Sequence, residues 1–317
     1  MGPFVRQQLM GKGMLAIRIT EVGPRDGLQN EPAVLSTDAK VAFVNALSQS
    51  GVTEIEVGSF VSPRAVPQLA DSDEVFQRID RRPGVVYSAL VPNERGLSRA
   101  RAAAADKIAV FTAASDTFNQ RNIHCTVRES IERLKPVVSE AKRHGLPVRG
   151  YVSTAIHCPF EGAVPPSRVL RVMEDLLDLG VDEISLGDTI GKATPSDVRR
   201  LLDDVKTHLV SALLSLHFHD TYGMAIANVL TAWTEYGIAS FDASAGGLGG
   251  CPYAPGATGN VATEDVVYAL RASGASIAVD ERLVIQAAKH LGALLSRPLS
   301  SRLSTVHQRR TACEVVP

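Results

Sequence analysis

The sequence predicts a single (β/α)8 (TIM) barrel with one extra helix at its C-terminal end. Its 317 residues are enough for one barrel-sized domain. Short β-branched or apolar runs alternate eight times with segments of helical periodicity, at roughly 30 residues a unit, as in a closed parallel barrel. An open doubly wound sheet is the main rival. However, the turn after the first strand reads Glu21-Val-Gly-Pro-Arg-Asp-Gly27, without the GxGxxG spacing of a phosphate loop.

The expected strands are short and apolar, and they cover Ala16–Thr20, Glu54–Val57, Val85–Leu90, Lys107–Phe111, Val148–Val152, Glu183–Leu186, Leu213–His217 and Ser240–Ala243. The expected helices between them cover Asp38–Ser50, Asp71–Arg78, Glu94–Ala104, Val127–His144, Pro166–Leu179, Pro195–Leu209, Met224–Tyr236 and Thr263–Ala272. Thr37 can cap the first helix. Gly51, Gly145 and Gly180 stand where a helix ending needs a residue that tolerates φ > 0.

The end of the chain adds one more element. Asp280–Leu294 has the pattern of a helix packed on the barrel. No linker-like stretch divides the chain before it, so we expect one domain over residues 15–300, with flexible termini at residues 1–14 and 301–317. The first 13 residues hold two basic residues and no useful apolar run, which predicts neither a secretory signal nor a transit peptide.

Composition excludes several classes of function. The net charge of −1, from 33 Lys and Arg against 34 Asp and Glu, provides no basic field for nucleic acid and no polybasic membrane signal. No apolar run approaches the roughly 18 residues that span a bilayer. Four widely spaced cysteines form neither a CxxC pair nor a disulfide framework, which favours a reducing cytoplasm. A local patch for an anionic ligand stays open.

Polar residues gather after the expected strands, at the end of a barrel where catalytic residues lie. Nothing comparable gathers at the opposite strand ends. The segments concerned include Glu21, Arg25, Asp26 and Gln29 after the first strand, Glu56 and Ser59 in the second, Tyr151 in the fifth, Asp188 in the sixth, His217, His219 and Asp220 in the seventh, and Gly246 to Cys251, Asn260 and Glu264 after the eighth.

His217 and His219 are the sharpest pair among these residues. Residues two apart in a strand face the same side, so both imidazoles can point into the barrel mouth. The first strand lies beside the eighth on barrel closure, so Asp26 and Asn260 could complete a site for a divalent cation. The alternative is two histidines hydrogen-bonded at a strand end, with Asp220 as a partner. We favour the metal site.

Cys251 ends a run with four glycines in five positions, which can fold over a ligand and present a thiol. A flexible turn with an incidental cysteine is the alternative. Arg25 adjoins Asp26 and could stabilise an oxyanion. The alternative is a surface ion pair between the two residues, which by itself would contribute little.

Three further acidic residues, Glu56, Asp188 and Glu264, could orient Arg or His side chains. Helix caps and solvated charges are equally good explanations of each.

Several stretches of the chain together resemble the 3-hydroxy-3-methylglutaryl-CoA lyase family. The resemblance covers about residues 15–275, and its Gly-Gly-Cys-Pro-Tyr-Ala loop and Ser-Phe-Val-Ser-Pro segment are its most specific parts. The matching segments are Ile19–Glu31, Ser59–Arg64 with Val66–Gln68, Val148–Ser153, Glu183–Gly191, His217–Gly223, Gly246–Ala254 and Gly259–Asp265.

The resemblance implies roles for individual residues. Asp26, His217, His219 and Asn260 match metal ligands, with Mg²⁺ or Mn²⁺ as the usual ion. Arg25 matches the catalytic arginine, and Cys251 the loop thiol. The remaining matches are supporting acidic positions at Glu56, Asp188 and Glu264, and site-lining segments at Gln29, Ser59, Tyr151 and Ser185.

The implied reaction is a retro-Claisen cleavage of an acyl-CoA substrate, 3-hydroxy-3-methylglutaryl-CoA, to acetyl-CoA and acetoacetate. The general base is left open between a nearby His and Asp188. A homodimer is implied by analogy alone. No nucleic acid or membrane partner is expected.

The segment after the fifth strand departs from the family pattern. It has Thr154, His157 and Phe160 where the family suggests Cys, Gly and Tyr. A bulky His157 near the mouth could change which acyl group fits. Thr154 and His157 therefore keep open a lyase for another 3-hydroxy-3-alkylglutaryl-CoA. Two independent alternatives are a Claisen-type synthase on the same metal site and a catalytically silent barrel that binds acyl-CoA or metal.

Overall fold

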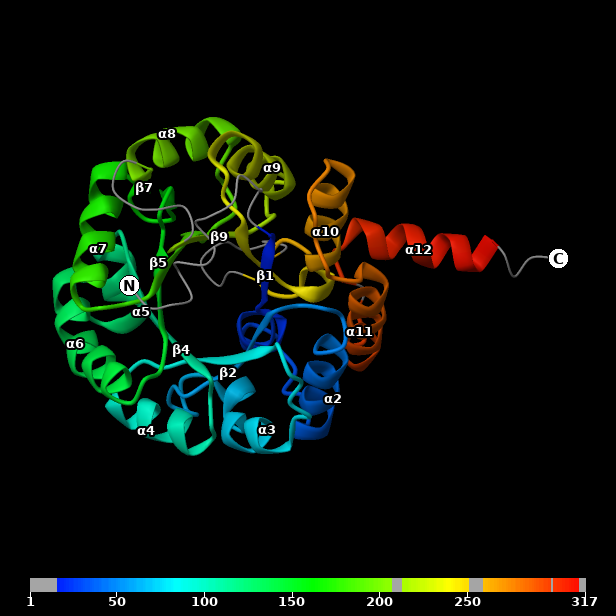
Figure 1. Cartoon of the computed structure of the whole chain (residues 1–317), viewed down its shortest axis with the longest axis horizontal. Helices are drawn as coiled ribbons and strands as arrows, with labels where there is room; N and C mark the ends of the chain where they lie inside the picture. The colour runs from blue at the N-terminus through cyan, green and yellow to red at the C-terminus, as the bar shows by residue number, and fades with distance from the viewer. Residues whose placement is uncertain (1–15, 207–212, 251–258, 298, 314–317) are drawn as a thin grey trace.

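Eight parallel strands close a barrel in the order β1-β10-β9-β8-β5-β4-β3-β2, with helices around it (Figure 1). The structure is a computed structural model that describes residues 16–206, 213–250, 259–297 and 299–313. The barrel strands are β1 (Arg18–Glu21), β2 (Glu54–Ser59), β3 (Val86–Leu90), β4 (Lys107–Ala113), β5 (Val148–Ser153), β8 (Glu183–Asp188), β9 (Leu214–Phe218) and β10 (Ser240–Ala243). The predicted fold class is confirmed.

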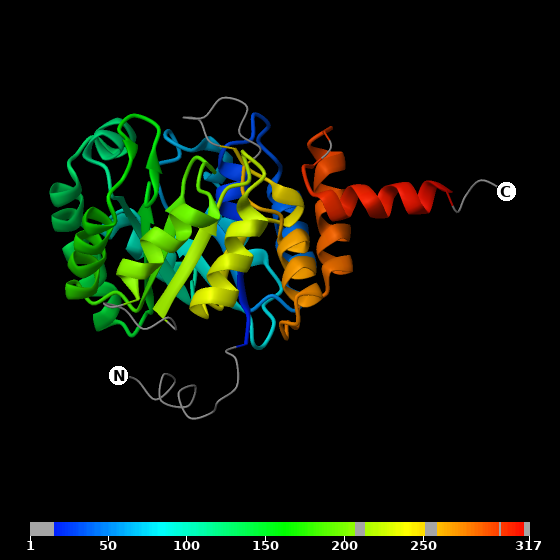
Figure 2. The ribbon, with the colours of Figure 1, turned by 90° about the horizontal axis from the view of Figure 1, so that it is seen from above.

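A ring of helices packs against the outside of the strands (Figures 1 and 2). Their bounds are α2 (Thr37–Leu47), α3 (Ser72–Arg78), α4 (Glu94–Ala102), α6 (Val127–Arg143), α7 (Pro166–Asp178), α8 (Pro195–Val205), α9 (Ala225–Tyr236) and α10 (Thr263–Ala272). All eight were expected from their periodicity. The extra helix is confirmed as α11 (Glu281–Leu294), which packs beside α2 and α10.

Further elements of the structure were not expected from the sequence. Helix α5 (Asp116–Ile123) follows β4, and a small hairpin of β6 (His157–Cys158) and β7 (Gly162–Ala163) follows β5. Helix α12 (Arg302–Cys313) comes after α11, near the end of the chain. None of these elements contributes a strand to the barrel.

Helix α12 occupies a segment that was expected to be flexible, and it extends away from the barrel (Figures 1 and 2). Its start is fastened to α10, because Asp265 accepts hydrogen bonds from the backbone of Arg302 and Leu303 at 3.0 and 2.9 Å. Ser304 also donates to Glu264, at 2.7 Å. These contacts join segments 37 to 40 residues apart, so local periodicity does not reveal them.

The start of α2 differs in one detail from the prediction. Ser36, not Thr37, is the capping residue, and its hydroxyl accepts a hydrogen bond from the backbone of Ala39 at 3.3 Å. Thr37 instead donates to Asp71 at 2.8 Å, which ties α2 to the start of α3.

The glycines expected at helix ends do adopt positive φ. The values are +86°, +71° and +95° at Gly51, Gly145 and Gly180. The helix endings before Gly145 and Gly180 are confirmed, since residues with a Cβ rarely adopt this backbone conformation. Helix α2 ends earlier than expected, at Leu47, and Gly51 lies in the turn that follows it.

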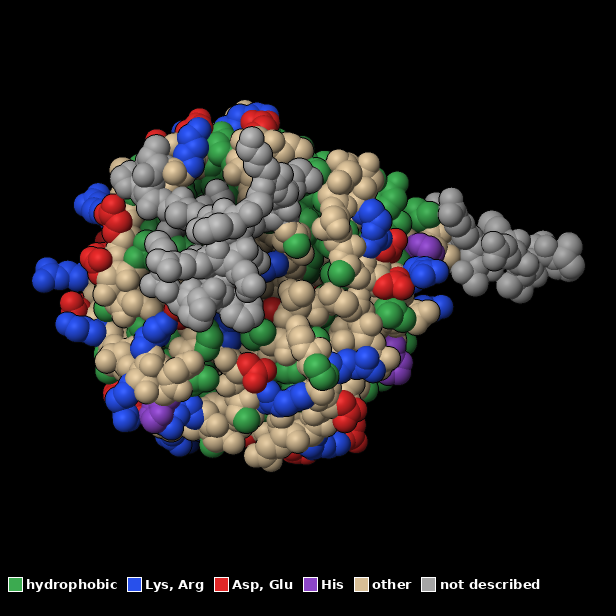
Figure 3. Space-filling view, viewed as in Figure 1, with side chains coloured by type: hydrophobic (Ala, Val, Ile, Leu, Met, Phe, Trp, Pro, Cys, Tyr) green, Lys and Arg blue, Asp and Glu red, His purple; other side chains and the backbone are tan. Residues whose placement is uncertain are grey.

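The barrel interior is polar, while the space between strands and helices is apolar. Apolar side chains of the strands and the inner faces of the helices form one continuous core. The barrel interior contains buried charges, among them Lys107, Arg149, Glu183 and Asp242. Among the described residues, no helix combines the length and hydrophobicity needed to cross a bilayer. On the face shown in Figure 3, side chains of both charges are interspersed around the rim.

Candidate metal centre and active site

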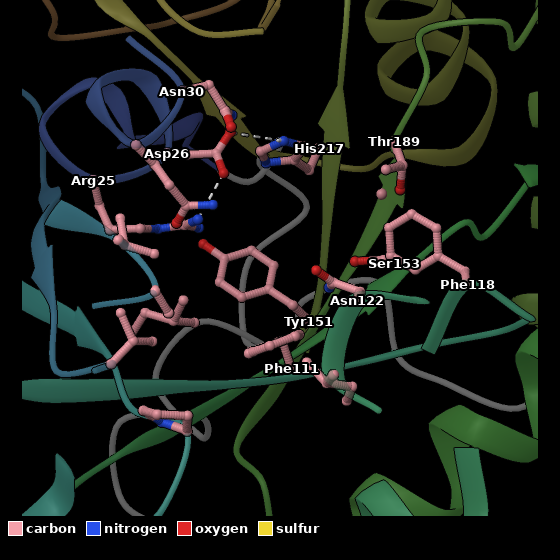
Figure 4. Close-up of a pocket in the computed structure, with 18 of the residues that line it drawn as sticks. Arg25, Asp26, Asn30, Phe111, Phe118, Asn122, Tyr151, Ser153, Thr189 and His217 are labelled. Atoms are coloured by element: carbon pink, nitrogen blue, oxygen red, sulfur yellow. Dashed lines mark hydrogen bonds and ion pairs between the residues drawn. The ribbon is translucent and has the colours of Figure 1, made fainter. Parts of the chain in front are cut away.

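A cavity of about 580 Å³ opens at the C-terminal ends of the strands. This is the end of the barrel at which the sequence predicts the chemistry. Its polar lining includes Arg25, Asp26, Gln29, Asn30, Asn93, Asn122, Tyr151, Ser153, Thr189, His217 and His219, and its apolar lining includes Val61, Leu90, Phe111, Phe118 and Ile123. Figure 4 shows Asp26 between Arg25 and His217, with the Tyr151 ring beside them.

The loop after β1 forms one wall of the site through a tight turn, η1 (Gly23–Gly27). Glycine is required at Gly23 because a Cβ there would lie 2.7 Å from the Glu21 carboxylate. That carboxylate accepts hydrogen bonds from the backbone of Gly23 and Ala245, at 2.8 and 2.9 Å, and from the hydroxyl of Thr263 at 2.7 Å. Glu21 therefore fastens the first loop to the segment after β10.

Asp26, His217 and His219 form a cluster that could hold a metal ion. Each offers one ligand atom, and these atoms all lie within 4.8 Å of one another. The Nε2 atoms of His217 and His219 lie 3.9 and 4.0 Å from Asp26 Oδ2. A carboxylate and two imidazoles on one side of an open cavity suit a divalent cation that keeps positions for substrate.

Asn260 completes this cluster. It forms a β-bridge with His219, and its Nδ2 donates to Asp26 Oδ2 at 2.9 Å. Its Oδ1 is buried and has no hydrogen-bond partner among the described residues. Such an atom is costly unless something binds it, so this amide oxygen fits a fourth ligand. The structure thus brings together all four residues predicted as ligands.

The charges of the cluster also suit a cation. Burial opposes ionisation of Asp26, but Arg25 and the two histidines outweigh it and lower the Asp26 pKa to about 2. Burial, together with the neighbouring His217, lowers the pKa of His219 to about 4. Asp26 is therefore ionised and His219 unprotonated at neutral pH, which are the forms that bind metal. Burial opposes protonation of His217, but its contacts with Asp242 and Asp26 outweigh burial and raise its pKa.

Arg25 is held rigidly at the edge of the cavity. Its Nε donates to Glu56 Oε2 and its Nη1 to Asp26 Oδ1, both at 2.6 Å. Its guanidinium lies 5.7 Å from the centre of the Tyr151 ring. The Arg25 and Asp26 side chains are only 8% and 16% exposed, so their pair is not the surface ion pair given as the alternative. Glu56 does not line the cavity, and its contact orients Arg25.

Besides Glu56 and Asn260, three further predicted site residues do not line the cavity. Asp188 accepts hydrogen bonds from the backbone of Lys192 and Ala193, at 3.1 and 3.0 Å, and burial raises its pKa to about 7. Glu264 accepts from the backbone of Gly246 at 2.9 Å. The Ser59 hydroxyl bonds weakly to backbone at 3.4 Å. The side chains of all three therefore stabilise nearby backbone.

Two other residues predicted to line the site do so. Gln29, in the segment after β1, and Tyr151, on β5, both border the cavity. Ser185, in a segment that the family resemblance places around the site, is instead fully buried and donates to Asp242 at 2.8 Å.

The residues that depart from the family pattern do not themselves line the cavity, although Thr154 and Phe160 contact the lining residues Thr189 and Phe118. His157 is in β6, with its Nε2 3.6 Å from Asp197 at the start of α8. Thr154 is fully buried, and the Phe160 ring lies 6.4 Å from that of Phe118. The expectation that His157 crowds the mouth is therefore not met, because the β6–β7 hairpin turns it toward α8.

Cys251 lies outside the described residues. The residue before it, Gly250, lines the cavity, and its carbonyl accepts a hydrogen bond from Asn30 at 2.9 Å.

Asp242 was not predicted from the sequence, although it contacts the metal cluster through His217. The Nδ1 atom of His217 lies 3.2 Å from Asp242 Oδ2. The sequence did contain a signal for it: Asp242 lies inside a strand predicted to be buried, and a buried carboxylate needs charged or polar partners. The apolar lining from Phe111 and Phe118 was also missed, and no motif marked it.

The chain is similar to known proteins along most of its length. The family model described as HMGL-like matches residues 16–291. Hydroxymethylglutaryl-CoA lyase of Pseudomonas mevalonii is 48% identical, over 95% of this chain and 100% of that protein. The crystal structure of the HMG-CoA lyase of Bacillus subtilis is 45% identical with a TM-score of 0.91, covering 92% of this chain and 98% of that one.

A further solved structure is that of an HMG-CoA lyase of Acinetobacter baumannii in complex with coenzyme A and 3-methylmalate. It is 40% identical with a TM-score of 0.88, and covers 93% of this chain and 96% of that chain. These similarities extend over the whole barrel. The chain therefore belongs to the HMGL-like family.

Proposed function

We propose that this protein is a metal-dependent carbon–carbon lyase that cleaves 3-hydroxy-3-methylglutaryl-CoA to acetyl-CoA and acetoacetate. One observation carries the proposal. Asp26, His217, His219 and the amide oxygen of Asn260 meet beside Arg25 at the edge of a cavity large enough for an acyl group. Relatives at 40–48% identity that are named as lyases of this substrate support the assignment.

The four clustered side chains would hold the cation, with Mg²⁺ or Mn²⁺ as the proposed ion. When bound, such an ion supplies Lewis acidity that makes a substrate hydroxyl more acidic. The chain's contribution is the ligand geometry. Asp26 is fixed between Arg25 and Asn260, at 2.6 and 2.9 Å, so its position does not depend on the ion.

Arg25 would stabilise the negative charge that develops as the bond between C2 and C3 of the substrate breaks. The bonding electrons become those of a thioester enolate, and the tertiary hydroxyl gives its proton to a general base, which leaves the ketone of acetoacetate. A guanidinium stays charged at any working pH and is most effective where it is already in place. The two hydrogen bonds that hold Arg25 provide that preorganisation.

Cys251 would deliver the proton that converts the enolate to acetyl-CoA. Support comes from the sequence, where Cys251 follows the glycine run, and from Gly250, which lines the cavity immediately before it.

The proposed acceptor of the hydroxyl proton is a nearby His or Asp188. Burial raises the Asp188 pKa to about 7, which suits a general base at neutral pH. Both Asp188 oxygens accept backbone hydrogen bonds and its side chain is outside the cavity lining, so Asp188 would act through a water.

The alternatives are not favoured. A silent binding barrel would be expected to lose a ligand or the arginine, whereas Arg25 and the four predicted ligands lie together. A Claisen-type synthase shares the metal ligands, but the relatives reported above are named lyases. A substrate with a different alkyl group is not favoured, because His157, the main reason to consider one, faces Asp197 and does not line the cavity.

Three wider expectations accompany the proposal. An acyl-CoA partner is supported by the relative that was solved with coenzyme A. A homodimer is proposed by analogy with the family. A reducing cytoplasm remains the proposed compartment, and Cys125 and Cys158 are buried free thiols that suit it.

The proposal is tested by incubating purified protein with Mg²⁺ or Mn²⁺ and several 3-hydroxyacyl-CoA thioesters, and following the release of acetyl-CoA. We expect release from 3-hydroxy-3-methylglutaryl-CoA that stops with chelator and returns with added metal. Release from that substrate in the presence of excess chelator, or from none of the thioesters, would contradict the proposal.

A further inference from the structure

We propose that Asp242 is a positioning residue that fixes the tautomer and orientation of His217 and thereby sets the metal affinity of the site. The inference rests on the proposed metal centre and adds a residue to which no role has been assigned. It stands on the hydrogen-bond geometry around one buried carboxylate.

The two residues face each other across neighbouring strands. Asp242 on β10 is paired in register with His217 on β9, so both side chains enter the barrel interior side by side. Asp242 is 2% exposed, and its side chain has no accessible surface. The contact between Asp242 Oδ2 and His217 Nδ1, at 3.2 Å, is therefore shielded from water.

Four groups converge on the Asp242 carboxylate. Its Oδ2 accepts from the Ser185 hydroxyl at 2.8 Å as well as facing His217. Its Oδ1 accepts from the Ser215 hydroxyl at 3.2 Å and lies 2.9 Å from Arg149 Nη1. A carboxylate in this setting can only accept hydrogen bonds, and its position is determined from both sides.

This geometry decides which nitrogen of His217 carries the proton. Because Asp242 only accepts, a neutral His217 must donate through Nδ1, and its Nε2 is then left with a free lone pair. That Nε2 is the atom 3.9 Å from Asp26, on the side of the proposed ion. The Tyr151 ring lies edge-on to the imidazole, with ring centres 6.2 Å apart, and further limits its rotation.

His219 provides a contrast within the same cluster. Its Nδ1 is buried and has no hydrogen-bond partner among the described residues. Among the described residues, no carboxylate therefore selects the tautomer of His219 as Asp242 does for His217.

Arg149 anchors the arrangement from the barrel interior. It is almost wholly buried, and its Nε lies 2.6 Å from Glu183 Oε1. Lys107 links Glu183 to Glu54. Glu54 thus belongs to the same buried network but is separated from His217 by several residues, which makes it a matched control.

The first measurement needs no variant of Asp242. Protein labelled with ¹⁵N-histidine, free of metal and at mildly alkaline pH, is examined by long-range ¹H–¹⁵N correlation, with His217→Gln identifying the signal. The proton is expected on Nδ1 of His217. A proton on Nε2 would overturn the proposal whatever the enzyme's activity.

The second measurement compares Mn²⁺ affinity, by titration calorimetry, in wild type, Asp242→Asn and Glu54→Gln. An asparagine amide can donate to Nδ1 and move the proton to Nε2, so the Mn²⁺ Kd should rise about 10–100-fold. Glu54→Gln should keep the wild-type Kd. An unchanged Kd in Asp242→Asn, or an equal rise in Glu54→Gln, would overturn the proposal.

These outcomes are separable from failure of the proposed function. Wild-type protein that binds no Mn²⁺ would refute the metal centre, while the tautomer of His217 would still report on Asp242. If Asp242→Asn does not fold, the spectrum of the wild type decides the question.

Discussion

Asn260 donates a hydrogen bond to Asp26 across 2.9 Å, although 234 residues of sequence separate them. The contact joins the loop after β1 to the segment after β10, which become neighbours only when the barrel closes. It fixes the amide so that Nδ2 faces the carboxylate, and it leaves Oδ1 without a partner among the described residues. Closure of the barrel therefore assembles the metal cluster.

Replacing Asn260 by Ala should weaken metal binding. The change removes the amide oxygen and the hydrogen bond that orients Asp26, so we expect the Mn²⁺ Kd to rise about 10–100-fold. Titration calorimetry provides the measurement. Asn45→Ala is the control and should keep the wild-type value, because Asn45 bonds to Asp80 at the protein surface. Equal affinity in Asn260→Ala would exclude Asn260 as a ligand.

Replacing Arg25 by Ala should lower kcat at least a hundredfold, because losing one preorganised oxyanion donor typically costs ~3–4 kcal/mol. The change also leaves Glu56 and Asp26 without their buried partner, so unfolding by urea should be measured in parallel. The exposed Arg78→Ala serves as control. A folded Arg25→Ala protein with wild-type kcat would refute the role.

Replacing Cys251 by Ser tests the proton-delivery step. A hydroxyl is a much weaker acid than a thiol, so kcat should fall by about 10²–10⁴-fold while Mn²⁺ affinity stays unchanged. The buried Cys158→Ser is the control for thiol loss elsewhere. Wild-type turnover in Cys251→Ser with metal bound would show that the thiol has no acid–base role.

Replacing Glu21 by Gln should change how stability depends on pH. Burial raises the Glu21 pKa from 4.5 to about 7, although its hydrogen bonds oppose the rise. Between pH 4.5 and about 7, Glu21 is protonated in the folded protein and ionised in the unfolded chain. The contribution of Glu21 to the free energy of unfolding therefore falls as pH rises through this range. Glutamine does not titrate, and can still accept from Gly23 and Ala245.

The free energy of unfolding of Glu21→Gln, relative to wild type, should therefore grow by about 1–3 kcal/mol between about pH 5 and pH 8. Urea unfolding at both pH values measures it. Glu129→Gln is a suitable control. Hydrogen bonds to Thr126 lower the Glu129 pKa, so that carboxylate is ionised in both states across this range. A constant difference for Glu21→Gln would contradict the prediction.

The barrel could be predicted well because each strand and each outer helix carries its own periodicity. The elements that were missed lack that signal. Helix α5 has the mostly polar sequence DTFNQRNI, and the two strands of the β6–β7 hairpin have two residues each. Helix α12 depends on contacts from Ser301 and Ser304 to α10, which only the folded chain brings together.

The site was predicted at the level of strand ends and less well at the level of side chains. Asp26, His217 and His219 were identified because strand alternation and barrel closure determine where they point. Asp188 and Glu264 stand at equally suggestive positions, but nearby backbone amides take up their carboxylates. Whether such a carboxylate bonds nearby backbone or faces the cavity depends on the conformation of the loop, which neither residue spacing nor residue type reveals.

The most direct test of the metal centre is anomalous diffraction from a crystal grown with Mn²⁺. We expect a single ion bound by Asp26 Oδ2, the Nε2 atoms of His217 and His219, and Asn260 Oδ1, with open positions toward the cavity. A crystal that binds Mn²⁺ elsewhere, or that leaves these four atoms without an ion, would contradict the proposed metal centre.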